Sequence, residues 1–268
     1  MSIKRFLSGI ILFPIFAVIM IFANKYIIDC MVSVIAIMSL HEFYKAFRKK
    51  AKPVEWVGYI AAVSIAFIHI IPSRMILYIV GAIIPASIMI LFVRSVLSEL
   101  KVNIMDIAIT FFGICYIVLF LMFAPIIKEN IPNGNILVWF VFFSSWGTDV
   151  FAYLIGKNFG KHKFTEVSPN KSIEGCLGGI IGATLIILVY TAVCNHTLAI
   201  NIDYAYAGLV AVLLSVVSQI GDLSASSIKR YCEIKDYSNL IPGHGGMLDR
   251  IDSVIFTLPF AYFLLMLV

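Results

Sequence analysis

Residues 175–194 read GCLGGIIGATLIILVYTAVC, a run of 20 residues without a charged side chain. An α-helix of about 20 residues is about 30 Å long, which matches the hydrocarbon core of a bilayer. The run is apolar throughout and lacks the alternation that a lipid-facing barrel strand requires. It therefore predicts a helix that crosses a membrane.

The rest of the chain contains eight more apolar runs of similar length. They lie at about 6–23, 26–44, 56–73, 75–93, 105–127, 134–156, 204–227 and 250–268. With 61% hydrophobic and 13% charged residues among 268, the composition excludes an ordinary soluble globule. The first run begins at Lys4-Arg5 and has no small-residue cleavage site, so we expect a retained span rather than a signal peptide. We predict an all-α, polytopic integral membrane protein with about nine transmembrane helices.

The basic residues indicate the orientation of these spans. With nine spans, all of the 20 lysine and arginine residues except Lys25, Arg74 and Lys128 lie on the same side as the N-terminus. The positive-inside rule then places the N-terminus and the long polar loops in the cytoplasm. Basic residues on this side anchor the spans and are attracted to anionic lipid, which accounts for the formal net charge of +5. We therefore expect the lipid bilayer rather than nucleic acid as a partner.

Acidic residues occur where a bilayer should exclude them. Asp149 lies inside the run 134–156, and Asp222 lies near the end of the run 204–227. A charged group at mid-membrane costs about 2.5–3.5 kcal/mol on insertion scales, so such residues usually face a protein interior or a wet cavity. Asp222 shares a helix face with other polar residues at three- and four-residue spacing, namely Ser215, Ser218, Gln219, Ser226 and Lys229. Asp249 and Asp252 lie three residues apart at the start of the last span, so three helices direct acids toward the cytoplasmic half. For Asp149, structural hydrogen bonding remains the alternative to a functional role.

Three other acids have simpler interpretations. Asp29 and Asp106 lie near the ends of their runs and are expected at the membrane interface. Glu42 lies at the end of the second run, where an ion pair with Lys45 is the simplest interpretation and a functional role is the alternative.

Two polar loops have the composition of phosphate-binding sites. The loop 156–175 contains glycines and lysines but lacks the spacing of a P-loop. The loop 226–252 is richer, and a glycine-rich turn that leads into a helix presents backbone N–H groups to an anion. Carboxylates among so many cations suggest Mg²⁺, which usually binds one or two protein carboxylates together with substrate phosphates. Zinc is disfavoured, because His162 and His244 lack Cys or His partners at ligand spacing. His244 either contacts a phosphate or stabilises the turn.

Glycines at positions 175, 178, 179 and 182 could suggest a dinucleotide-binding motif. They lie within an apolar run of membrane-spanning length, however, where small residues allow close packing between helices. We therefore predict helix packing at these positions.

The stretch from Ser226 to Asp252 resembles the signature of the phosphatidate cytidylyltransferase family. That signature is S-x-[apolar]-K-R-x4-K-D-x-[small]-x2-[apolar]-P-x-H-G-G-[apolar]-x-D-R-x-D, and every specified position agrees. The segment 146–179 is similar to a second family region, although Asn170 and Ser172 stand where Lys and Thr are expected. Lys157 likewise stands where Arg is common. The resemblance covers the chain from about residue 140 onward.

The resemblance implies transfer of a cytidylyl group from CTP to phosphatidic acid, which yields CDP-diacylglycerol and pyrophosphate in phospholipid biosynthesis. It implies a requirement for Mg²⁺ and an active site on the cytoplasmic side of the inner (plasma) membrane. With it, we expect catalytic roles for Asp222, Asp249, Lys229, Arg230, His244 and Arg250, substrate binding by Ser168, Lys171, Ser226, Lys235, Asp236, Gly245 and Gly246, and metal binding by Asp222, Asp249, Asp149 and Asp252.

The expected organisation places spans one to five in residues 1–130. The catalytic region, spans six to nine with their cytoplasmic loops, occupies residues 131–268. Two alternatives remain, an ion-coupled transporter that uses the intramembrane acids and a CTP-dependent lipid kinase. A homodimer also remains open.

Overall fold

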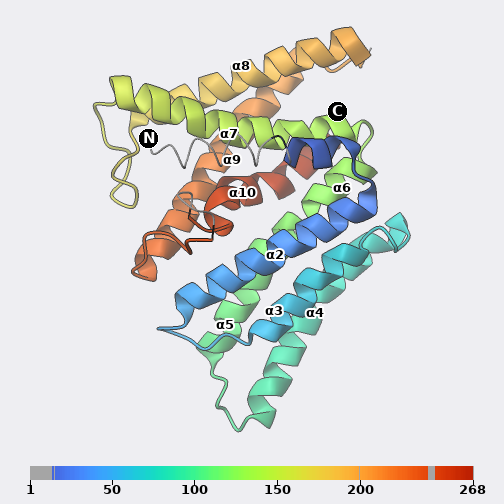
Figure 1. Ribbon diagram of the computed structural model, residues 1–268, viewed down its shortest axis with the longest axis vertical. Coiled ribbons are helices and arrows are strands. Elements are labelled where there is room, and N and C mark those ends of the chain that lie inside the picture. The colour runs from blue at the N-terminus through green and yellow to red at the C-terminus, as the bar shows by residue number, and fades with distance from the viewer. Residues whose placement is uncertain (1–13, 15, 199, 241–244, 268) are drawn as a thin grey trace. The chain divides into compact units, whose positions relative to one another are not determined.

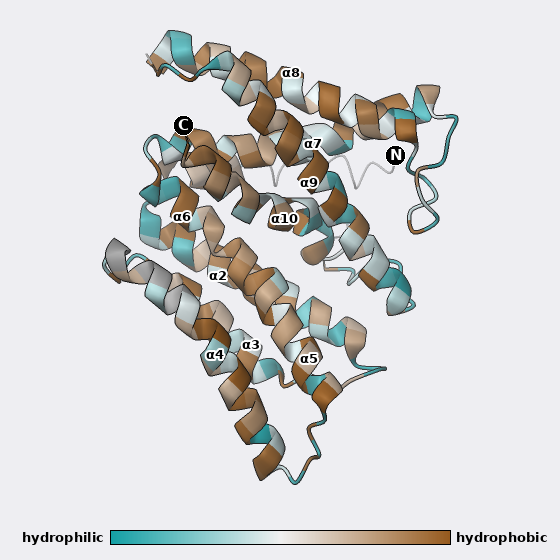
Figure 2. Cartoon of the chain, turned by 180° about the vertical axis from the view of Figure 1, so that it is seen from behind, coloured by the Kyte–Doolittle hydropathy of each residue, from teal (hydrophilic) through white to brown (hydrophobic). Residues whose placement is uncertain are grey.

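The computed structural model describes residues 14, 16–198, 200–240 and 245–267, and these residues form helices without a strand. The elements are α2 (Lys25–Phe47), α3 (Glu55–Val63), η1 (Ser64–Phe67), α4 (Ser73–Leu97), α5 (Ile104–Gly113), η2 (Ile114–Leu119), α6 (Phe123–Asn130), α7 (Gly134–Phe159), α8 (Ile173–Leu198), α9 (Tyr204–Tyr231) and α10 (Leu248–Leu265) (Figure 1). Apolar residues extend along each helix, and polar residues gather in the loops and at helix ends (Figure 2). Each predicted span from residue 26 onward overlaps a helical segment. Half of the first predicted span, 6–23, lies outside the described residues, namely residues 6–13 and 15.

Five of the described helical stretches are long and apolar enough to cross a membrane. They are Lys25–Phe47, Ile104–Asn130, Gly134–Phe159, Ile173–Leu198 and Tyr204–Tyr231. The apolar stretches Glu55–Phe67 and Gly81–Leu97 are shorter. An all-helical, multi-pass membrane protein is confirmed, and the count of nine spans stays a prediction.

The chain forms two compact units. The first contains Met1–Pro125 and Tyr231–Ile251, and the second contains Ile126–Arg230 and Asp252–Val268. The signature therefore contributes residues to both units. We call Tyr231–Ile251 the signature segment.

In the first unit, two acids that the sequence placed near span ends are buried and have partners. Asp29 on α2 is 0% exposed and lies 2.8 Å from Nδ1 of His69. Asp106 accepts hydrogen bonds from the backbone N–H groups of Lys52 and Asn103 and forms a capping box at the start of α5. Asp29 thus connects α2 to the turn after η1, and Asp106 connects α5 to the loop after α2.

In the second unit, α7 and α8 lie side by side and pack through glycines (Figure 1). A Cβ atom on Gly178, Gly179 or Gly182 would fall less than 3.0 Å from atoms of α7. The predicted role of these glycines in helix packing is confirmed.

Candidate functional site

Acidic and basic side chains meet in the second unit. The ammonium group of Lys171, which precedes α8, forms an ion pair with the carboxylate of Asp222 on α9. Lys229 Nζ lies 3.9 Å from Oδ2 of Asp252 at the start of α10. Asp252 is 7% exposed and interacts electrostatically with Asp222 and with Asp149 on α7. The structure thus brings together three of the four predicted metal ligands and two of the predicted phosphate-binding lysines.

Close packing of α9 and α10 positions Asp222 beside Asp252. The glycine that precedes Asp222, Gly221, faces the backbone of Asp252, and a Cβ there would lie 2.9 Å from the Asp252 carbonyl oxygen. Ser253, the next residue on α10, donates a hydrogen bond of 3.4 Å to Oδ2 of Asp149. The three carboxylates are therefore held by three different helices of one unit.

The polar stripe predicted on α9 serves partly in helix contacts. Ser215 hydrogen-bonds to Thr148 of α7 across 2.6 Å, and the amide of Gln219 donates to the carbonyl oxygen of Cys176 on α8 across 3.2 Å. These bonds satisfy buried polar groups between apolar helices, where an unpaired group is costly. Farther along the stripe, Asp222 pairs with the ammonium group of Lys171.

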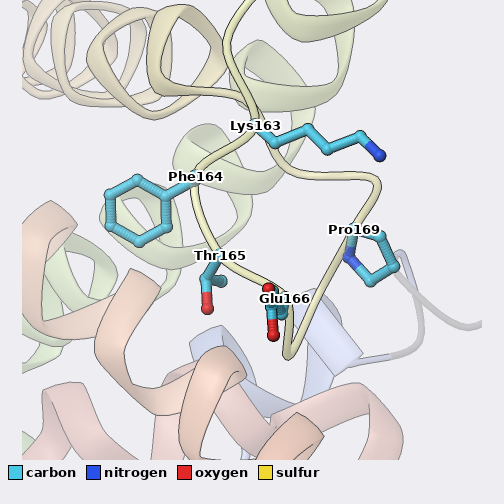
Figure 3. A pocket seen from close by; sticks show the side chains of 5 residues that line it. All are labelled: Lys163, Phe164, Thr165, Glu166 and Pro169. Atoms are coloured by element: carbon cyan, nitrogen blue, oxygen red, sulfur yellow. The ribbon is translucent and has the colours of Figure 1, made fainter.

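Lys171 is presented by a short hairpin between α7 and α8. An antiparallel bridge joins Lys163 to Ser172, and the N–H of Phe164 donates to the carbonyl oxygen of Lys171 across 2.9 Å. The hairpin encloses a hollow of about 440 Å³, lined by Lys163, Phe164, Thr165, Glu166 and Pro169 (Figure 3). Lys163 and Phe164 extend to opposite sides of the hairpin (Figure 3). The predicted substrate residue Ser168 lies on this hairpin and is half-buried.

In the first unit, Asp249 closes the signature segment on itself. Its Oδ2 accepts hydrogen bonds from the N–H groups of Tyr237, across 2.9 Å, and Gly246, across 3.0 Å. Gly245 has a φ of 83°, a left-handed conformation that favours glycine. The glycine pair of the signature therefore allows a tight turn onto the Asp249 carboxylate.

Glu42 of α2 is a second carboxylate at this turn, and sequence reasoning missed its role. It is 4% exposed and accepts hydrogen bonds from Ser238 Oγ and from the N–H groups of Met247 and Leu248. The expected ion pair with Lys45 does not form in the described part of the chain, because the carboxylate faces the signature segment and Lys45 is exposed. A lone glutamate near the end of an apolar run gives no spacing signal for a partner so distant in sequence.

The amide groups of the glycine-rich turn were predicted to face an anionic ligand. The N–H groups of Gly246, Met247 and Leu248 donate instead to the protein's own carboxylates, Asp249 and Glu42. This expectation is wrong for these three amides, because the sequence did not reveal Glu42 as their neighbour. Substrate binding by Gly245 and Gly246 stays a prediction.

The remaining predicted residues differ in exposure. Arg230, Lys235, Asp236 and Arg250 are exposed, Ser226 and Lys229 are half-buried, and His244 lies outside the described residues. Asp222 and Asp249 belong to different units, and the metal site predicted to join them stays a prediction.

The donor set of the second unit suits a hard cation. Asp222, Asp252 and Asp149 offer carboxylate oxygens, the ligand type that Mg²⁺ prefers. Within the described ranges, no three His, Cys, Asp or Glu side chains are grouped closely enough to hold a metal by themselves. Mg²⁺ does not need such a cage, since it usually keeps several waters and shares its remaining positions with substrate phosphates.

Comparison with known proteins gives consistent matches. A model of the cytidylyltransferase family matches residues 3–268. Phosphatidate cytidylyltransferase of Bacillus subtilis (strain 168) is 38% identical over 168 residues, which cover 62% of this chain and 59% of that protein. The enzyme of the same name from Staphylococcus saprophyticus is 36% identical over 172 residues, 64% of each chain. That of Synechocystis is 40% identical over 139 residues, 52% of this chain and 46% of the relative. The matched stretches span less than two thirds of these relatives.

Proposed function

The chain belongs to the cytidylyltransferase family, and from this we propose that it transfers a cytidylyl group from CTP to phosphatidic acid. The products are CDP-diacylglycerol and pyrophosphate. The observation that carries the proposal is the pairing of Lys171 with Asp222 beside Asp252 and Lys229. These cations and carboxylates stand on the segments that match the family's motifs, and the relatives bear the name of this activity.

The reaction requires positioning and charge neutralisation rather than a covalent nucleophile. A phosphate oxygen of phosphatidic acid attacks the α-phosphorus of CTP in line, the bond from that phosphorus to the bridging oxygen breaks, and pyrophosphate leaves. Lys171 and Lys229 balance carboxylate charge in the second unit and can turn their ammonium groups toward incoming phosphates. Arg230, Lys235 and Arg250 are exposed and add positive charge for the same purpose.

The carboxylates have a complementary role. Asp222 and Asp249 would hold Mg²⁺, with Asp149 and Asp252 as further ligands or supporting acids. Such an ion would neutralise charge on the α-phosphate and the leaving pyrophosphate.

The proposed setting is the inner membrane, with nine spans, a cytoplasmic N-terminus and the active site on the cytoplasmic side. The segregation of basic residues supports this arrangement. Two single-cysteine variants test this orientation, each made in a protein whose own five cysteines are replaced by alanine. They are Glu166→Cys, between α7 and α8, and His196→Cys, near the end of α8. In intact cells, an impermeant maleimide should modify the cysteine at position 196 and spare that at position 166. The opposite pattern would reverse the proposed orientation.

The activity is tested with purified protein, phosphatidic acid, Mg²⁺ and CTP labelled on the α-phosphate. Label should enter the lipid phase while pyrophosphate is released. Entry of label from γ-labelled CTP, with release of CDP, would instead identify a lipid kinase. If neither the α-label nor the γ-label enters lipid, both enzyme activities are excluded and the transporter alternative is left. Light scattering of the detergent-solubilised protein tests the homodimer.

A further inference from the structure

Glu42 lies on α2 within the first unit, about 200 residues in sequence from the groups that it binds. Its Oε1 accepts from Ser238 Oγ across 2.5 Å and from Met247 N across 3.0 Å, and its Oε2 accepts from Leu248 N across 2.8 Å. The side chain is almost fully buried. A buried carboxylate is stable only when it is hydrogen-bonded, and all three of its donors come from the signature segment. The contact is therefore a structural part of the first unit.

Two of these donors lie at the start of α10. The first N–H groups of a helix have no partner within the helix, and the helix dipole favours a negative charge beside them. Glu42 therefore caps α10 from a different helix. Gly246 allows this contact, because a Cβ there would lie 2.4 Å from Oε2 of Glu42.

The turn that follows α2 holds the other end of the signature segment. Lys50, just beyond α2, donates a hydrogen bond of 2.5 Å to the carbonyl oxygen of Tyr231, and its ammonium lies 3.8 Å from the centre of the Tyr231 ring. The neighbouring Cys232 is 2% exposed. The signature segment is thus attached to the α2 region near both of its ends.

We propose that Glu42 is a positioning residue that fixes the first turn of α10, and with it Asp249 and Arg250, for catalysis. This role rests on the proposed cytidylyl transfer. Glu42 itself contacts neither substrate nor metal in this proposal. It acts by holding the backbone that carries the residues of the site.

The test variant is Glu42→Gln, which keeps the size of the side chain but replaces one accepting oxygen with an NH₂ group. That group would face a backbone N–H, so a pair of donors would meet at the start of α10. A misplacement of about 1 Å in a catalytic array can cost about a hundredfold in rate, and we expect a decrease in kcat of that order. Ser238→Ala removes a single donor and should have a smaller effect in the same direction. The two changes should combine non-additively, because they act on one contact.

A second measurement reports the position of the segment without relying on turnover. In a variant that keeps Cys232 as its only cysteine, with Cys30, Cys115, Cys176 and Cys194 replaced by alanine, maleimide labelling measures the access to Cys232. Burial raises the pKa of the Cys232 thiol, which further slows its reaction. Glu42→Gln should accelerate labelling several-fold if Glu42 holds the segment.

Glu55→Gln is the matched control. Glu55 lies on α3 of the same unit and bonds Arg48 and Tyr59, so the substitution removes the same charge without touching the signature segment. We expect its kcat and Cys232 labelling to stay close to those of the parent. An unchanged labelling rate in Glu42→Gln, or a kcat within about threefold of the parent, would overturn the proposal. If the parent protein produces no CDP-diacylglycerol, the proposed function fails and with it the catalytic role of Glu42, while the labelling still shows whether Glu42 holds the segment.

Discussion

Gly221 of α9 lies directly against the backbone of Asp252 on α10. A Cβ atom on Gly221 would be 2.9 Å from the Asp252 carbonyl oxygen and 2.9 Å from Cβ of Phe256. Separations this short require one of the helices to shift. The absence of a side chain at position 221 therefore sets how closely α9 and α10 approach beside Asp222.

Gly221→Ala should reduce both stability and activity. Overpacking a tight contact typically costs about 1–3 kcal/mol, and the shift would separate Asp222 from Asp252. Gly208→Ala is the control on the same helix, since its nearest neighbour, Cδ2 of Leu188, would be 3.8 Å from the new Cβ. We expect this variant to match the parent or to gain about 0.5–1 kcal/mol from helix propensity. Thermal unfolding in detergent measures the stability of the two variants, and initial rates measure their activity. Equal effects of the two substitutions would contradict the packing argument.

Lys171→Gln should weaken CTP binding more than it slows chemistry. The substitution removes the ion pair with Asp222 and a cation available to phosphate. Hydrogen bonds to charged groups contribute about 1.5–3 kcal/mol, so KM for CTP should rise about tenfold or more. Lys163→Gln, which changes an exposed lysine of the same hairpin, is the control and should leave KM almost unchanged. A KM unchanged in Lys171→Gln would remove Lys171 from the phosphate site.

Removal of divalent cations should abolish cytidylyl transfer. The triphosphate of CTP and the carboxylates Asp222, Asp252 and Asp149 repel one another without a bridging cation. EDTA should stop turnover by the purified protein, and Mg²⁺ should restore it. Asp222→Asn should lower the rate at least about a hundredfold, the scale seen when one electrostatic contact to a transition state is lost. Full activity in EDTA would contradict the metal assignment.

Gly246→Ala should reproduce the labelling behaviour of Glu42→Gln. Its new Cβ would displace the Glu42 carboxylate, which accepts from the two amides at the start of α10. Faster maleimide reaction at Cys232, relative to the parent single-cysteine protein, is the expected result. Reaction at the parent rate would show that the turn accommodates a methyl group without moving the signature segment.

Much of the architecture could be predicted from the sequence, because continuous apolar runs and their spacing report directly on helices in lipid. The runs 134–156, 175–194 and 204–227 correspond to α7, α8 and α9, and the glycines of α8 do pack against α7. The run 105–127 was expected as a single span. Ile104–Asn130 is indeed one helical stretch long enough to cross a membrane. Within it, the helix passes from α5 through the π-helical η2 to α6, a local change in helix geometry that hydrophobicity does not reveal.

Contacts between distant residues were the part that the sequence could not supply. The stripe on α9 predicted which residues share a face, but it did not predict that Ser215 would bond Thr148 while Asp222 would bond Lys171. Glu42 and the partnership of Asp29 with His69 were missed for the same reason. Helical periodicity defines the face of a residue, whereas the identity of its partner depends on how helices pack together.

The glycine contacts between α7 and α8 also restrict how a lipid could approach. Where a single methyl group would already collide with Thr148 or Phe151, an acyl chain cannot slip between the two helices. In the proposed reaction, a diacyl substrate would therefore reach the carboxylates by a route other than the contact between α7 and α8.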